Sequence, residues 1–180
     1  MIETIAILLL VGLDQLIKYL VRTRIPLGGH VDFIPYVLDL THLRNSGAAF
    51  SVLSGGGARW FFVVLTVAFV GFAMWVLYAK KLTHPMGRWA LAGIVAGAVG
   101  NLIDRALFGY VVDMFETLFI SFPVFNVADI YVTVCGVLKR QEKKQQKRPR
   151  MKLRMKVLKR QKKKQQKRPK MKPRMKVLKR

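Results

Sequence analysis

Long apolar segments separated by short polar ones fill residues 1–138. Residues 2–21 form a segment of 20 residues, which as an α-helix would be about 30 Å long, enough to cross the hydrocarbon core of a bilayer. Residues 60–79 and 89–110 form two further apolar segments, and residues 122–138 form a fourth at the short limit for a span. The pattern predicts an α-helical membrane protein with four transmembrane helices.

The region between the first two apolar segments, residues 22–59, is too long for a tight turn. It contains Pro26, Pro35 and several glycines, and residues 30–43 mix apolar and polar positions in short runs. Such runs bounded by turn residues are typical of short β-strands. We therefore expect a small extracytoplasmic β-element here.

Charge is distributed very unevenly along the chain. The sequence carries 32 Lys+Arg against 9 Asp+Glu, a formal net charge of +23. Residues 139–180 contribute +22 of this and include a single acid, Glu142, whereas residues 1–138 contribute +1. Because the basic part has almost no core-forming residues, the sequence excludes a basic globular nucleic-acid-binding domain.

The basic tail is a tandem repeat. Residues 137–156 and 157–176 agree at 17 of 20 positions, with too little apolar content to bury a core. We expect residues 139–180 to be disordered and residues 1–138 to form the membrane domain. The short loop 80–88 is also basic, and basic segments stay in the cytoplasm. Both termini are therefore predicted to be cytoplasmic, with residues 22–59 and 111–121 on the outer side.

Several ionisable side chains fall inside the apolar segments, where they mark a functional site or a structural pair. Asp14 and Lys18 are four residues apart, on one helix face. Asn101, Asp104 and Arg105 likewise share a face. These groups equally fit an alternative in which they form buried salt bridges that neutralise one another.

Asp113 and Asp129 differ from these groups because neither has a basic residue three or four positions away. Two carboxylates brought together without a cation share a proton, so one is protonated while the other is ionised. Aspartic hydrolases use that arrangement to activate water and to protonate or polarise a carbonyl. The alternative is two unrelated aspartates at the membrane interface.

Four motifs lie on the predicted spans in order. They are DQLIK at residues 14–18, RNSGAAFS at 44–51, GNLIDR at 100–105 followed by GYVVD at 109–113, and FPVFNVAD at 122–129. Together they make the chain resemble the lipoprotein signal peptidases (signal peptidase II) of bacteria over residues 1 to about 138.

The resemblance implies an aspartic peptidase of the bacterial inner membrane that cleaves diacylglyceryl-modified prolipoproteins just before the lipidated cysteine. It further implies an active site that faces the periplasm, inhibition by globomycin, and no metal or organic cofactor. Asp113 and Asp129 fall on the catalytic dyad. Other motif positions are implied to bind substrate (Asn45, Asn101, Arg105, Asn126) or to support the site (Asp14, Lys18, Gly47, Asp104, Ala128).

Two other classes of protein fit parts of the pattern. A non-catalytic membrane anchor would use the basic tail to bind anionic lipid or nucleic acid. Specific nucleic-acid recognition is not expected, because the tail has no element that reads bases. A proton-coupled carrier would use the intramembrane carboxylates, but four spans without an inverted repeat offer little for alternating access.

Overall fold

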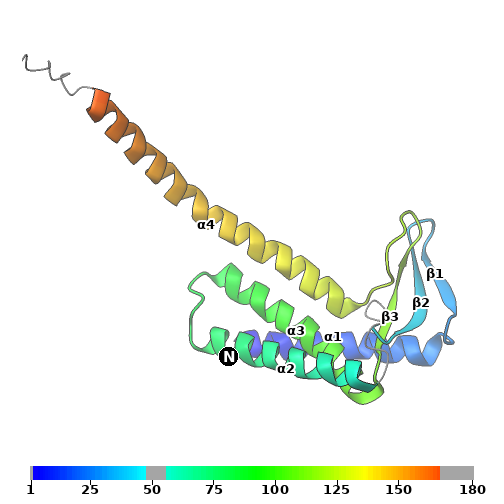
Figure 1. Ribbon diagram of the computed structural model, residues 1–180. Helices are drawn as coiled ribbons and strands as arrows, with labels where there is room; N and C mark the ends of the chain where they lie inside the picture. Colours follow the sequence, from blue (N-terminus) through cyan, green and yellow to red (C-terminus); the bar gives the residue numbers. More distant parts are fainter. Residues whose placement is uncertain (1, 48–55, 167–180) are drawn as a thin grey trace, which may run out of the picture. The chain divides into compact units, whose positions relative to one another are not determined.

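The computed structural model describes residues 2–47 and 56–166; residues 1, 48–55 and 167–180 lie outside the described part. The chain has four helices and three strands (Figure 1), in the order α1 (Ile2–Arg24), β1 (His30–Ile34), β2 (Leu38–Asn45), α2 (Gly56–Tyr78), α3 (Pro85–Phe108), β3 (Val111–Thr117) and α4 (Val127–Gln166). Residues Met1–Glu142 form one compact unit and Lys143–Arg180 form a second.

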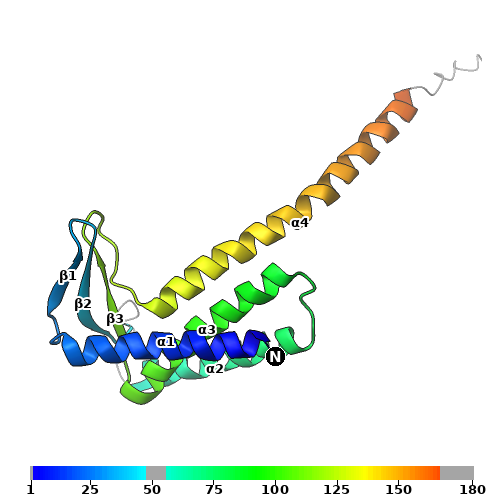
Figure 2. The same cartoon turned by 180° about the vertical axis from the view of Figure 1, so that it is seen from behind.

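Three of the described helices, α1, α2 and α3, are long and apolar enough to cross a membrane. Helices α1 and α2 both lie along α3 (Figures 1 and 2). Helix α2 exposes large apolar side chains such as Trp60 and Val64. Lipid tails, and not water, are the surroundings that such a surface fits. The predicted fold class, an α-helical membrane protein with a small β-element, is confirmed.

The fourth predicted span, residues 122–138, needs a correction at its start. Helix α4 begins only at Val127, because Phe125 forms an isolated antiparallel bridge with Phe115 of β3. Its apolar part therefore runs only from Val127 to Leu138 before the lysines begin, and α4 is not among the described helices that are long and apolar enough to span.

Small residues line the face of α3 that meets α4. A Cβ atom on Gly97 would lie 2.8 Å from Val132 Cγ2, and one on Gly93 would overlap Cys135 Sγ. Glycines let two helix backbones approach closely in a membrane, where no hydrophobic effect drives helices together. The Gly93–Gly97 spacing seen in the sequence thus serves the α3–α4 contact.

The β-element is an antiparallel sheet in the order β1-β2-β3. The sequence predicts it within residues 22–59, but its third strand, β3, comes from the 111–121 segment, for which the sequence predicts only a place on the outer side. Val112 and Met114 of β3 are fully buried and pack against Val21 of α1 and Ile25, the residue that follows α1. This packing fixes the sheet at the end of the helices where α1 and α3 finish (Figure 1).

The tail also departs from expectation as far as Gln166. Residues 139–166 were expected to be disordered, but they continue α4 as a helix. Lysine, arginine, glutamine, methionine and leucine are all strong helix formers. A segment made of them can therefore be helical without a core to bury, which the reasoning from low apolar content overlooked.

Candidate active site

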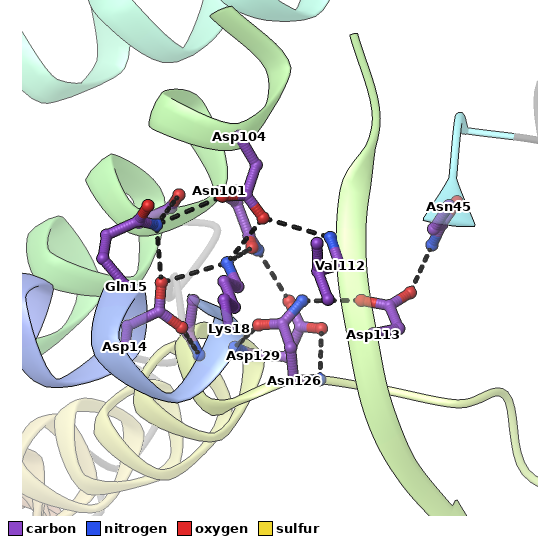
Figure 3. Close-up of polar contacts among 12 residues, drawn as sticks. Asp14, Gln15, Lys18, Asn45, Asn101, Asp104, Val112, Asp113, Asn126 and Asp129 are labelled. Carbon is purple, nitrogen blue, oxygen red and sulfur yellow. Dashed lines mark hydrogen bonds and ion pairs between the residues drawn. The ribbon is translucent and has the colours of Figure 1, made fainter. Parts of the chain in front are cut away.

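Asn126 joins the two aspartates singled out from the sequence. Its side-chain Nδ2 donates a hydrogen bond of 2.7 Å to Asp113 Oδ1. Its Oδ1 accepts a hydrogen bond of 3.1 Å from the backbone N–H of Asp129, and its own backbone N–H donates to Asp129 Oδ2 at 3.2 Å. A strand and a helix thereby present their carboxylates on either side of one amide (Figure 3).

The start of α4 explains why the chain folds this way locally. Asn126 precedes the first residue of α4 and Asp129 is the third residue within it. Their reciprocal side-chain-to-backbone hydrogen bonds form a capping box, which satisfies backbone donors that the first turn leaves free.

Asp113 lies on β3 and is only 3% exposed. Its Oδ2 accepts a hydrogen bond of 2.8 Å from Asn45 Nδ2 at the end of β2. Burial raises the pKa of the Asp113 carboxyl, the hydrogen bonds from Asn126 and Asn45 lower it, and the nearby charge of Asp129 raises it again. The net direction is upward, so this group keeps a proton to a higher pH than an ordinary aspartate.

Asn45 is itself held in place by the turn that follows β2. Its Oδ1 accepts a hydrogen bond of 2.9 Å from the backbone N–H of Gly47, whose φ of +85° suits glycine. This leaves the Asn45 amide nitrogen facing Asp113. Residues 48–51 of the same motif lie outside the described residues.

A buried charge cluster lies beside the two aspartates. The Lys18 ammonium is fully buried, 3.0 Å from Asp14 Oδ2 and 3.2 Å from Asp104 Oδ2. It also donates a hydrogen bond of 2.9 Å to Asn101 Oδ1, and Asn101 Nδ2 donates one of 2.9 Å to Asp129 Oδ1. One chain of contacts therefore runs from the cluster to Asp129 (Figure 3).

The carboxylates of Asp14 and Asp104 also accept hydrogen bonds from backbone N–H groups. Asp14 Oδ1 accepts a hydrogen bond of 3.0 Å from the N–H of Ala128, so Ala128 takes part through its main chain. Asp104 Oδ2 accepts a hydrogen bond of 3.0 Å from the N–H of Val112. These bonds fix the strand and the helix that carry Asp113 and Asp129.

Arg105 is half-buried on α3. Its guanidinium lies 5.6 Å from the centre of the Phe62 ring and within electrostatic reach of Asp113 and Asp129. A fixed positive charge there can favour negative charge that develops beside the two aspartates.

Gln15 is a member of the cluster that the sequence reasoning missed. Its Nε2 donates to Asp14 Oδ2, to the Gly100 carbonyl and to Asp104 Oδ1, at 3.1–3.2 Å. Its position between Asp14 and Lys18 in an apolar segment was the available signal. Within the described residues, no group of three or more His, Cys, Asp or Glu could hold a metal ion.

A multi-pass helical bundle with paired carboxylates near its sheet defines a membrane enzyme of the aspartic peptidase class. A family model described as "Signal peptidase (SPase) II" matches residues 6–140. The chain therefore belongs to the signal peptidase II family.

Curated relatives and solved structures agree with the family. The lipoprotein signal peptidases of Streptococcus pyogenes serotype M5 (strain Manfredo) and serotype M1 are each 45% identical over 138 residues, which cover 74% of this chain and 87% of the relative. A bacterial membrane enzyme solved by the in meso method at 1.9 Å resolution matches with a TM-score of 0.70 and 33% identity, over 76% of this chain and 88% of that one.

Proposed function

We propose that this lipoprotein signal peptidase removes the signal peptide of diacylglyceryl-modified prolipoproteins by cleaving before the lipidated cysteine, with Asp113 and Asp129 as its catalytic pair. The observation that carries the proposal is the Asn126 bridge, which bonds the Asp113 carboxylate through its side-chain amide and the Asp129 carboxylate through its backbone N–H. Two adjacent carboxylates in different environments are suited to opposite protonation states.

The surroundings of Asp113 and Asp129 indicate which of them acts as the acid and which as the base. Burial raises the pKa of Asp113, so it is the group that carries a proton and polarises or protonates the scissile carbonyl. Asp129 lies in the first turn of α4 and accepts hydrogen bonds from Asn101 Nδ2 and from the backbone N–H of Asn126. Asp129 is then the base that takes a proton from the attacking water.

Four polar side chains are proposed to bind the substrate backbone: Asn45, Asn101, Arg105 and Asn126. Asn45 and Arg105 are the best placed to do so, since Asn45 is exposed at the end of β2 and Arg105 carries a charge beside the carboxylates. Asp14, Lys18, Gly47, Asp104 and Ala128 support the site. Membrane lipids surround it, and globomycin is the proposed inhibitor that occupies it.

We place the protein in the bacterial inner membrane with its sheet on the periplasmic side and both termini in the cytoplasm. The basic loop at residues 80–88 supports this orientation, because the connection between α2 and α3 lies at the opposite end of the helices from the sheet (Figure 1).

Substitution of each aspartate tests the proposal. Asp113→Asn and Asp129→Asn each remove one titrating group while keeping the shape, so each should lower cleavage of a lipidated prolipoprotein by at least about a hundredfold. The matched control is Asp32→Asn, which changes an exposed aspartate on β1. Product is measured by gel shift in reconstituted vesicles, with membrane abundance checked by blotting. Full activity in either variant would refute the catalytic pair.

A further inference from the structure

Helix α4 makes a contact just beyond its apolar part that the proposed chemistry does not use. Glu142 is the tail's one acid and is buried, with 7% exposure. Its Oε1 lies 3.7 Å from His84 Nδ1, and its carboxylate lies against Gly87, in the first turn of α3. A carboxylate is favoured at a helix N-terminus, where the dipole is positive.

Gly87 leaves room for the Glu142 carboxylate at this contact. A Cβ atom there would lie 2.5 Å from Glu142 Oε2, closer than a real Cβ approaches an oxygen. The Lys139 ammonium, one turn before Glu142, donates to the Gly87 carbonyl at 3.4 Å. Two side chains of α4, Lys139 and Glu142, thus contact the same residue of α3, Gly87.

The same turn of α3 is fastened to the other helices. Arg88 Nε donates a hydrogen bond of 2.7 Å to Glu3 Oε1 of α1. Arg88 Nη1 donates one of 3.2 Å to the Leu77 carbonyl at the end of α2. The first turn of α3 is therefore a fixed reference point to which α4 is attached.

Glu142 is also the last contact of an antiparallel seam between α3 and α4. Successive glycines of α3 meet successive residues of α4: Gly100 meets Ala128, Gly97 meets Ala128 and Val132, Gly93 meets Cys135, and Gly87 meets Glu142. In the middle of this seam the α3 residues are glycines, which let the two helix backbones approach closely. Slippage of α4 by one helical turn, about 5.4 Å, would break the Asn101–Asp129 hydrogen bond of 2.9 Å at the other end.

We propose that Glu142 is a positioning residue: through its contacts with Gly87 and His84 at the first turn of α3, and together with the Asp14–Ala128 hydrogen bond at the start of α4, it holds α4 at the depth and rotation at which Asp129 meets Asn101. The inference rests on the proposed catalytic role of Asp129. The repeat supports it, because the position equivalent to Glu142 in the second copy is Lys162. Only the first copy has the acid that this contact needs.

Steady-state kinetics on the full chain in vesicles test the proposal. Glu142→Lys, which installs the residue of the second copy, should lower kcat for prolipoprotein cleavage by about tenfold or more, since small misplacements of a catalytic group are costly. KM should change by less than about twofold, because Glu142 does not touch substrate. The control Lys162→Ala alters the equivalent position of the second copy and should leave both constants unchanged.

A second readout does not depend on activity. Cys135 is the chain's single cysteine, half-buried and packed on Gly93 in the seam. Glu142→Lys should speed its alkylation by a membrane-permeant maleimide by at least about threefold, because local opening exposes it. Gly87→Ala should act in the same direction, and its effect on kcat should vanish in a Glu142→Ala background, where no carboxylate opposes the new methyl group.

The outcomes distinguish the positioning role of Glu142 from the catalytic role of Asp129. Wild-type kcat and wild-type alkylation of Cys135 in Glu142→Lys would overturn the positioning role, as would additive effects of Gly87→Ala and Glu142→Ala. If Asp129→Asn is inactive while Glu142→Lys behaves as wild type, only the positioning role fails. If Asp129→Asn is fully active, the proposed catalytic function fails first.

Discussion

Lys18 determines which way the amide of Asn101 faces. A lysine ammonium only donates hydrogen bonds, so the oxygen of Asn101 must turn toward Lys18 and its nitrogen toward Asp129. The orientation of an uncharged side chain beside Asp129 is thus set by a buried charge. Removing one member of such a buried ion pair typically costs about 3–5 kcal/mol, because the partner is left uncompensated.

These side chains differ in how visible they are from sequence. Asp14, Lys18 and Asp104 stand out because charge inside an apolar segment is costly and so needs a reason. Gln15 makes as many contacts in the cluster but carries no charge, and the capping role of Asn126 depends on where α4 begins. Backbone donors such as the Ala128 N–H cannot be identified from the residue type.

The pH dependence of activity should respond to Asn45. The hydrogen bond from Asn45 lowers the pKa of Asp113, so Asn45→Ala should raise that pKa further. If Asp113 acts in its protonated form, activity is lost as pH rises through this pKa. The alkaline limb of the kcat/KM profile should therefore move to higher pH in Asn45→Ala.

The control for this measurement is Thr23→Ala, which removes an exposed hydroxyl bonded only within α1 among the described contacts. Its pH profile should match that of the wild type. An alkaline limb that stays in place or moves to lower pH in Asn45→Ala would contradict the assigned role of Asp113.

At the scale of the elements, the local patterns predicted the helices well and the sheet less well. Apolar runs of 20 residues or more identify α1, α2 and α3, because each is set by its own composition. Strand β3 pairs with β2, from which it is separated by two helices, so its existence depends on a tertiary contact. The start of α4 depends likewise on the bridge between Phe115 and Phe125.

The close contacts in the α3–α4 seam predict different effects on stability for substitutions of two glycines. Gly97→Ala should destabilise the protein by about 1–3 kcal/mol, because the new methyl group would overlap the Ala128 carbonyl and Val132. Gly12→Ala is the matched control, since a Cβ atom at Gly12 has no neighbour within 4 Å among the described residues. Thermal unfolding in detergent micelles measures both. Equal stability of the two variants would show that the seam is looser than described.

At the scale of the whole molecule, the uneven charge separates two roles. The body carries +1 and holds the proposed site, whereas the tail carries +22 and marks the proposed cytoplasmic side. The shift in composition predicts a division after residue 138, and the two compact units divide between Glu142 and Lys143. The composition did not predict the helix that runs to Gln166, because low apolar content excludes a core but does not exclude a helix.

Deletion of residues 143–180 distinguishes the peptidase from an anchor that works through its tail. The deletion removes the second compact unit and keeps Glu142. Cleavage of lipidated prolipoprotein should stay within about threefold of the wild type, because no proposed catalytic or positioning group is lost. The assay uses vesicles with and without anionic lipid. A deleted chain that is inserted and stable but inactive would contradict the proposed independence of the membrane domain.

The amide that joins Asp113 and Asp129 has one further consequence. An asparagine side chain does not titrate, so the bridge at Asn126 cannot relay a proton from one carboxylate to the other. Asn126 couples Asp113 and Asp129 in position, and their charges couple them as acids, because the charge of Asp129 raises the pKa of Asp113. In the proposed mechanism, a proton passes between the two carboxylates by way of the attacking water and the substrate, and not through the Asn126 side chain.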